Sequence, residues 1–256
     1  MSDLATSLHA CAEAVRKGDP DRFAATMATP APLRDRLWPL YAANLEIARA
    51  PWASSEPMVA EMRLQWWIDA LEGVGEGREP PHEIGPALVQ VAAPARHLIA
   101  VAEARRADCW PEPMSDASAL WAYLDQTAGS VYWAGAEALG ADLQAEVAVR
   151  AFGSAAGLAA LLQAVPELVA RARAPVADLS HEALAAYARE GLARLDFARQ
   201  SRALKGSARV ALIPGWQARA QLKRVCAAPE TVAAGGLERS EFSRRVGLLR
   251  AAFGAF

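Results

Sequence analysis

Apolar residues recur at steps of three and four along almost the whole chain, which is the spacing of one face of an α-helix. Alanine, leucine, arginine and glutamate dominate and β-branched residues are sparse, so local preference favours helices as well. No solenoid or heptad repeat accompanies this periodicity. The sequence therefore predicts an all-α protein, a single compact helical bundle of about eight or nine helices.

Turn and capping residues divide the pattern into segments. Asp19 and Pro20 are an expected helix start, Ser54 or Ser55 is the expected cap of a later helix, and Pro39 marks an expected kink. Helices are expected near residues 4–16, 33–50, 56–72, 94–107, 116–139, 142–173, 180–205, 207–227 and 237–253.

The clearest interruption runs from Gly73 to Gly85, where glycines and paired prolines cannot continue a helix. It is short, and little chain precedes it for a separate core. One domain over residues 1–256 is therefore expected, and a chain of this length can bury a large core.

Composition and charge exclude several classes of protein. The chain is 53% hydrophobic and 22% charged with a formal net charge of -2, so an ordinary globular protein without a nucleic-acid partner is expected. Cys11, Cys109 and Cys226 lie far apart, which predicts reduced thiols and a cytoplasmic location. The N-terminus lacks the pattern of a signal peptide, and Arg150 interrupts the most apolar stretch, so a buried helix is favoured there over a membrane span.

Residues that carry chemistry are not arranged in a familiar pattern. The four histidines are scattered, no phosphate-binding loop follows a strand, and no serine or cysteine nucleophile signature occurs. From the residues alone we predict no catalytic residue, no metal ligand and no cofactor.

The segment from Ser55 to Gly73, SEPMVAEMRLQWWIDALEG, is rich in large apolar side chains. Val59, Met62, Trp66 and Trp67 share an expected apolar stripe, and core packing is the simpler interpretation of the tryptophans. The other interpretation is that they line a cavity.

Four segments in this order resemble the squalene/phytoene synthase family. They are LYAANLEIA at 40–48, the segment at 55–73, YLDQTAGSV at 123–131 and GLAALLQAVP at 157–166. The likeness spans residues 23–175, and the RLQWW segment is the most specific part. It is similar to the divergent branch that includes the respiratory complex I assembly factor and its bacterial relatives. The resemblance implies the all-α isoprenoid synthase fold.

Active members of that family condense two prenyl diphosphates and hold Mg²⁺ with two aspartate-rich motifs, because a departing pyrophosphate needs its charge neutralised. Where the resemblance places the first motif, this chain has Ala48, Arg49 and Trp52. Where it places the second, the chain has Leu168 beside Glu167, with Ala172 a turn further on. Both clusters of aspartates are missing from the sequence at these positions.

The resemblance leaves three hypotheses open. The first is a non-catalytic pseudoenzyme, an assembly factor or binding scaffold with a protein partner in a respiratory membrane complex. The second is a Mg²⁺-dependent prenyl-diphosphate transferase in isoprenoid biosynthesis, and the third is an isoprenoid or lipid carrier. The first hypothesis, an assembly factor or scaffold, also implies a location in the cytoplasm or at the periphery of the inner membrane.

The resemblance also suggests which residues line a central cavity. Tyr123, Ala128, Gly129 and Val131 match a family pattern, and Tyr132 stands where a glycine is usual and is expected to narrow the cavity. The expected lining residues are Tyr41, Asn44, Arg63, Trp67, Tyr123, Gln126 and Gln163.

The last expected helix, Leu237 to Phe256, carries an apolar stripe and several arginines. Docking of the stripe on the chain's own bundle is the simpler interpretation. Contact with a membrane surface or a protein partner is the alternative.

Overall fold

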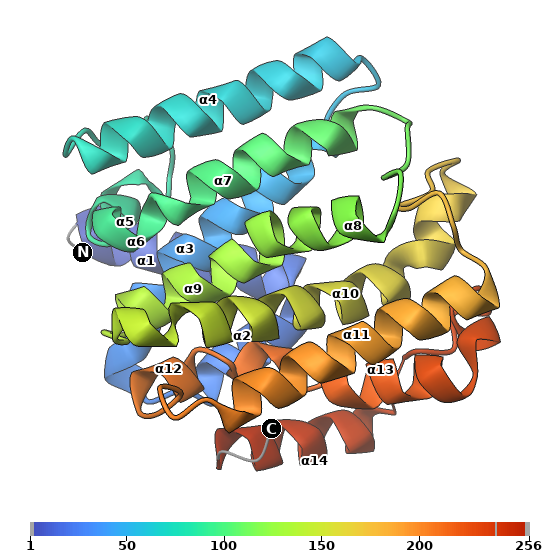
Figure 1. Cartoon of the computed structure of the whole chain (residues 1–256). Coiled ribbons are helices and arrows are strands. Elements are labelled where there is room, and N and C mark those ends of the chain that lie inside the picture. The colour runs from blue at the N-terminus through green and yellow to red at the C-terminus, as the bar shows by residue number, and fades with distance from the viewer. Residues whose placement is uncertain (1–2, 239, 254–256) are drawn as a thin grey trace.

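The computed structural model describes residues 3–238 and 240–253. These residues form α-helices joined by short helical turns and loops, without a β-strand in the described ranges; one isolated bridge joins Met114 and Val176. Figure 1 shows the helices packed around α10, which runs through the middle of the bundle. The all-α prediction is confirmed.

The first three helices are α1 (Asp3–Gly18), α2 (Pro20–Met27) and α3 (Ala31–Arg49). Asp19 caps α2 as predicted: its side chain accepts a hydrogen bond from the Arg22 backbone N–H, and Pro20 follows at the first helical position. The helix α3 continues through Pro39, which is buried.

After a short turn η1 (Ala50–Trp52), α4 covers Pro57–Gly75. The predicted serine cap is wrong, because Glu56 is the N-cap and no side chain caps the helix; Ser54 instead accepts a hydrogen bond from the Glu56 backbone N–H. The expected stripe is also corrected. Residues Ala60, Leu64, Trp67, Ile68 and Leu71 form the buried face, whereas Val59, Met62 and Trp66 are exposed.

The expected helix at 94–107 is divided into shorter pieces. The chain forms α5 (Gly85–Val89), α6 (Ala92–Ala95), α7 (His97–Ala104) and the turn η2 (Arg105–Cys109). The expected helix at 116–139 consists of α8 (Ala117–Leu124), a π-helical turn η3 (Asp125–Gly129) and α9 (Ser130–Ala138). A π turn inserts extra backbone into a helix and redirects the side chains around it.

The turn η4 (Leu143–Ala145) leads into α10 (Glu146–Ala170), the longest helix in the described ranges. Residues 143–170 are long and apolar enough to cross a membrane by length and composition, but 61% of the best window is buried inside the bundle. The helix also contacts α11, α9 and α13. The prediction of a buried helix therefore agrees with its place in the core.

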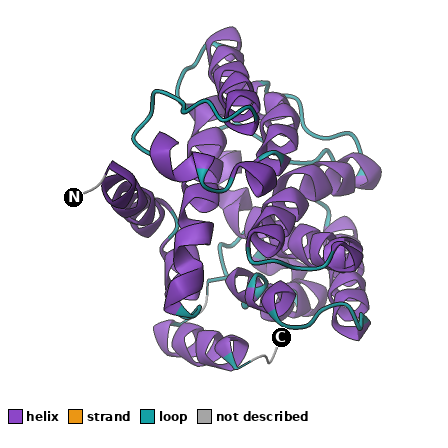
Figure 2. Cartoon of the chain, turned by 90° about the vertical axis from the view of Figure 1, so that its left-hand side faces the viewer, coloured by secondary structure: helices purple, strands orange, loops and turns teal. Residues whose placement is uncertain are grey.

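The C-terminal part contains α11 (His181–Gln200), α12 (Ser207–Val210), η5 (Ile213–Gly215), α13 (Ala218–Ala227), η6 (Pro229–Thr231) and α14 (Glu241–Ala252). The single helix expected at 207–227 is wrong: the chain turns at Pro214 and Gly215 before α13 begins. Figures 1 and 2 both place α14 at the edge of the bundle. Part of the expected 237–256 segment, at 239 and 254–256, lies outside the described residues.

Most of the buried apolar side chains belong to one continuous cluster that extends from Cys11 on α1 to Leu237 before α14. The helix α14 instead contributes Ala251 to a small separate cluster with Ala25 and Ile213. The main core therefore includes every long helix of the bundle, and α14 packs on its outside.

Candidate cavity and its charged walls

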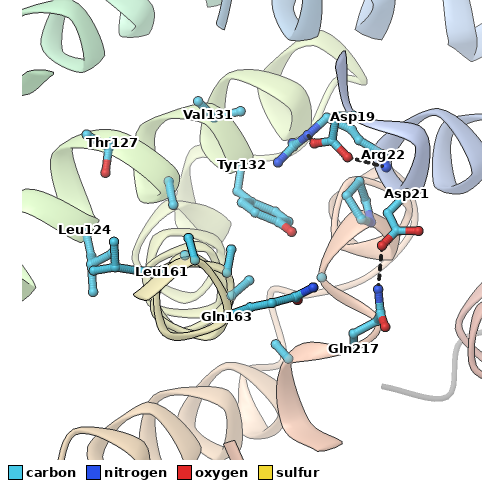
Figure 3. Close-up of a pocket in the computed structure, with 18 of the residues that line it drawn as sticks. Asp19, Asp21, Arg22, Leu124, Thr127, Val131, Tyr132, Leu161, Gln163 and Gln217 are labelled. Atoms are coloured by element: carbon cyan, nitrogen blue, oxygen red, sulfur yellow. Dashed lines mark hydrogen bonds and ion pairs between the residues drawn. The ribbon is translucent and has the colours of Figure 1, made fainter. Parts of the chain in front are cut away.

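A cavity of about 600 Å³ lies between α2, the π turn, α9, α10 and the segment from η5 to α13. Figure 3 shows its lining side chains. Small residues make up much of the α10 wall, namely Ala156, Gly157, Ala160 and Ala164. Their short side chains leave the space that larger residues at these positions would fill.

Close approach of α10 to the π turn forms this wall. A methyl group at Gly157 would lie 2.5 Å from Cβ of Ala128, and one at Gly153 would lie 2.9 Å from Cβ of Tyr132. Those distances are shorter than van der Waals contact, so glycine is the residue that fits here. The family-like small residues are thus explained by helix packing.

Arg22 lies at one end of the cavity. Its guanidinium lies 4.8 Å from the ring centroid of Tyr41 and 5.7 Å from that of Tyr132, and its Nε lies 3.0 Å from Oδ2 of Asp19. Burial acts to lower the pKa of Arg22, but Asp19 and the two tyrosines raise it above its usual value. Burial likewise raises the pKa of Tyr132. Arg22 therefore remains a cation, and Tyr132 beside it remains a neutral phenol.

Figure 3 shows Tyr132 reaching into the cavity toward this end. Its ring also meets Phe152 edge-on at 5.6 Å, and a methyl group at Gly215 would lie 3.0 Å from the Tyr132 hydroxyl. The tyrosine therefore fills space at the Arg22 end, as its bulk predicts.

A second, half-buried arginine, Arg105, also lines the cavity. Arg105 Nη1 lies 2.9 Å from Oδ2 of Asp108 and 3.3 Å from the Tyr123 hydroxyl, which itself donates to Asp108 at 2.8 Å. Burial raises the pKa of Tyr123. Arg105 and Tyr123 line both the main cavity and a second cleft of about 290 Å³, so this group forms the partition between them.

The second cleft contains the positions where the resemblance places metal-binding aspartates. Ala48 and Trp52 line it from α3 and η1, and Leu168 lines it from α10. The Trp52 ring lies 5.5 Å from the guanidinium carbon of Arg171 and 5.7 Å from that of Arg173. These arginine–tryptophan contacts therefore join η1 with the chain at the end of α10. Within residues 3–238 and 240–253, no group of three or more His, Cys, Asp or Glu side chains is close enough to share an ion.

Four acids at these walls are each paired with an arginine. Asp19 pairs with Arg22 and Asp108 with Arg105, as described above. Glu167 lies 2.5 Å from Arg171. Asp21 pairs with Arg244 and also accepts a hydrogen bond of 2.7 Å from Gln217, which Figure 3 shows. Carboxylates held in this way are engaged by cations of the protein itself.

The seven expected lining residues occupy different places. Asn44, Tyr123 and Gln163 line the main cavity, and Gln163 accepts a hydrogen bond of 2.6 Å from Gln221. Tyr41 is buried against Arg22, and Gln126 is exposed.

Arg63 and Trp67, the remaining two, line a separate cleft of about 220 Å³. There Trp67 meets Trp66 at 4.9 Å and His82 at 5.3 Å between ring centroids. This cleft lies along α4, which covers one edge of the bundle in Figure 1.

Sequence reasoning missed Asp19, Arg22, Arg105 and Asp108 as residues of the cavity walls. The sequence pattern indicates only a helix cap for Asp19, and Arg22 follows three residues later in the GDPDR turn. Arg105 and Asp108 lie in a short turn that carries no motif. An arginine three residues after a capping aspartate is the one sequence signal for these residues.

Comparison with known proteins agrees with this architecture. A crystal structure of a dehydrosqualene synthase with a bound ligand superposes with a TM-score of 0.78, covering 97% of this chain and 96% of that one at 16% identity. Squalene synthase HpnC from Alicyclobacillus acidocaldarius superposes with a TM-score of 0.68, covering 96% of both chains at 17% identity. The fold is thus the all-α isoprenoid synthase fold.

The family follows from the sequence match. The Squalene/phytoene synthase model matches residues 15–241, so the chain belongs to the squalene/phytoene synthase family. This confirms the resemblance drawn from the four segments.

Curated relatives come from one branch. Complex I assembly factor 6 from Homo sapiens is 28% identical over 164 residues, which is 62% of this chain and 49% of the relative. The homologue from Drosophila melanogaster is 29% identical over 188 residues, 66% of this chain and 53% of the relative. The matched region therefore spans about half the length of these relatives.

Proposed function

We propose that this protein is a non-catalytic member of its family that acts as an assembly factor for a respiratory membrane complex, with NADH dehydrogenase as its target. The observation that supports this most directly is the arginine pairing of the wall acids Asp19, Asp21, Asp108 and Glu167. Prenyl-diphosphate condensation needs carboxylates that are free to hold Mg²⁺. The similarity to complex I assembly factor 6 supports the choice of partner.

Electrostatics of the main cavity point the same way. Its lining includes four acids, Asp19, Asp21, Glu167 and Glu238, against the two arginines Arg22 and Arg105. Arg171 and Arg244 pair with Glu167 and Asp21, so the lining has no excess of positive charge to hold an anionic diphosphate without a metal. This charge balance supports a role other than diphosphate transfer.

The assay that tests the absence of catalysis is direct. The purified protein is incubated with farnesyl or geranylgeranyl diphosphate and Mg²⁺, beside a squalene synthase as the positive control. We expect no condensed product above a protein-free blank. Turnover comparable to that of the control enzyme would overturn the proposal in favour of the Mg²⁺-dependent transferase.

The assembly role is tested in a deletion strain. NADH:quinone oxidoreductase activity is measured in its membranes, and carotenoids or hopanoids are extracted in parallel. We expect the oxidoreductase activity to fall while the isoprenoids stay unchanged, and the wild-type gene to restore it. Loss of isoprenoids with normal oxidoreductase activity would contradict the assembly role.

The cavity supports a second candidate, an isoprenoid or lipid carrier. A volume of about 600 Å³ with an alanine-rich wall is large enough for a small apolar ligand. Native mass spectrometry of the purified protein distinguishes this candidate. A co-purified apolar molecule of defined mass, displaced by organic solvent, would favour the carrier.

A further inference from the structure

The inner face of α14 attaches it to the bundle through one ion pair and two apolar residues. Arg244 pairs with Asp21 of α2, and Ala251 is buried against Ala25 and Ile213. Leu248 packs at the edge of the same cluster. Residues 244, 248 and 251 share one side of a helix, so this side is the docked face.

The opposite side of α14 is apolar and exposed. Phe242 is 78% exposed, Leu249 60% and Phe253, directly after the helix, 85%. Their spacing of seven and then four residues places them in one stripe. The expected stripe is Phe242, Val246, Leu249 and Phe253. Docking of this stripe on the chain's own bundle is corrected for three of the four, which the described part of the protein leaves exposed, whereas Val246 is half-buried.

Two arginines flank the stripe. At 3.6 residues per turn, Arg245 lies about 60° to one side of the stripe and Arg250 about 80° to the other. Arg245 pairs with Glu241 at the start of the helix, and both side chains of that pair are largely exposed. Arg250 is exposed as well. The face thus has an apolar centre with Arg250 on one side and the Arg245–Glu241 pair on the other.

This arrangement fits the surface of a lipid bilayer. A helix that lies in the headgroup region inserts its apolar stripe between acyl chains, while flanking arginines extend outward to lipid phosphates. Anionic lipids attract basic residues placed beside the membrane, as the exposed Arg250 would be. The charge pattern therefore favours a lipid partner.

We propose that the outer face of α14, formed by Phe242, Leu249 and Phe253 between Arg245 and Arg250, binds peripherally to bilayers that contain anionic lipids. This inference goes beyond the proposed function, because it needs neither a respiratory partner nor an occupied cavity. The docked face would keep α14 on the bundle while its outer face lies on the lipid. Asp21, which holds Arg244, also lines the cavity, so bound lipid would lie beside the α2 wall.

Vesicle sedimentation tests this with the full chain. Sucrose-loaded vesicles of phosphatidylcholine alone are compared with vesicles that also contain phosphatidylglycerol. We expect binding to the anionic vesicles that weakens with added salt. Phe242→Ser with Phe253→Ser should lower the partition coefficient about tenfold or more, because two phenyl groups no longer leave water. Arg250→Gln should weaken binding to anionic vesicles and leave the phosphatidylcholine result unchanged.

A matched control is Phe197→Ser on α11, because Phe197 is also more than half exposed but lies on another helix. It should bind vesicles like the wild type. Circular dichroism melting curves establish that all variants remain folded, as expected for exposed positions.

Two outcomes would overturn the inference. One is vesicle binding by the wild type that is absent, or equal for the wild type and the double phenylalanine variant. The other is a concentration-dependent dimer in gel filtration that the same double variant abolishes, which would assign the stripe to a second copy of the chain.

Discussion

At the residue scale, two half-buried arginines set much of the charge of the cavity lining. Arg22 and Arg105 both line the cavity, and each is paired with an aspartate and in contact with a tyrosine. These partners offset the cost of withdrawing each guanidinium from water.

Trp67 provides a test of packing at the residue scale. It is 5% exposed, whereas its neighbour Trp66 is 39% exposed. We expect Trp67→Ala to lower the free energy of unfolding by about 3 kcal/mol or more, because a large buried ring leaves a cavity. Trp66→Ala is the matched control and should cost about 1 kcal/mol or less. Equal losses in urea titrations of the two variants would show that Trp67 is not a core residue.

His97 predicts a pH dependence. Its Nε2 lies 2.9 Å from Oε2 of Glu137, and Arg96, Arg150 and the Trp133 ring also surround it. Burial lowers the pKa of His97 more than Glu137 raises it. The unfolded chain then binds the proton more readily, so folding stability falls as the pH drops below the usual histidine pKa of about 6.5.

Replacing His97 should remove this dependence. Urea titrations at several values between roughly pH 7 and pH 5 should show a smaller loss of stability for His97→Asn than for the wild type. His181→Asn, at the exposed start of α11, serves as the control variant. A wild-type protein that gains stability on acidification relative to His97→Asn would reverse the predicted direction.

At the scale of elements, the contact between α10 and the π turn shapes the cavity wall. A π turn between α8 and α9 places Ala128 and Gly129 against the glycines of α10. The Thr127 hydroxyl donates to the Tyr123 carbonyl, four residues earlier in the chain, at 2.7 Å. Packing and cavity shape therefore depend on the same few small residues.

Gly153 tests this contact. Alanine there would place its Cβ 2.9 Å from Cβ of Tyr132 and 3.0 Å from the Ala128 carbonyl oxygen. We expect Gly153→Ala to destabilise the protein by about 1–3 kcal/mol through overpacking. Gly75→Ala is the control, because a Cβ at the last residue of α4 meets nothing within 4 Å. It should be neutral or slightly stabilising, and similar melting temperatures for both variants would contradict the close-packing argument.

At the scale of the whole molecule, one main core has the isoprenoid synthase fold, and several apolar side chains remain exposed on the surface. The main cluster of buried residues is continuous, and α14 lies outside it. Exposed apolar side chains gather on α14 and, at another edge, on α4, where Met58 and Met62 face solvent. A family fold can be retained for its stability while its surfaces acquire other roles.

The sequence by itself determined the helical class, the Asp19 cap, the family and the small residues Ala128 and Gly129. Each depends on local spacing or on residue type along one segment, which is visible without tertiary contacts. Only the tertiary structure decided which faces of α4 and α14 are exposed, because periodicity identifies a stripe but not what covers it. It also decided the pairs Asp21–Arg244 and Gln163–Gln221, since such partners lie far apart in the chain and meet only when the core has packed.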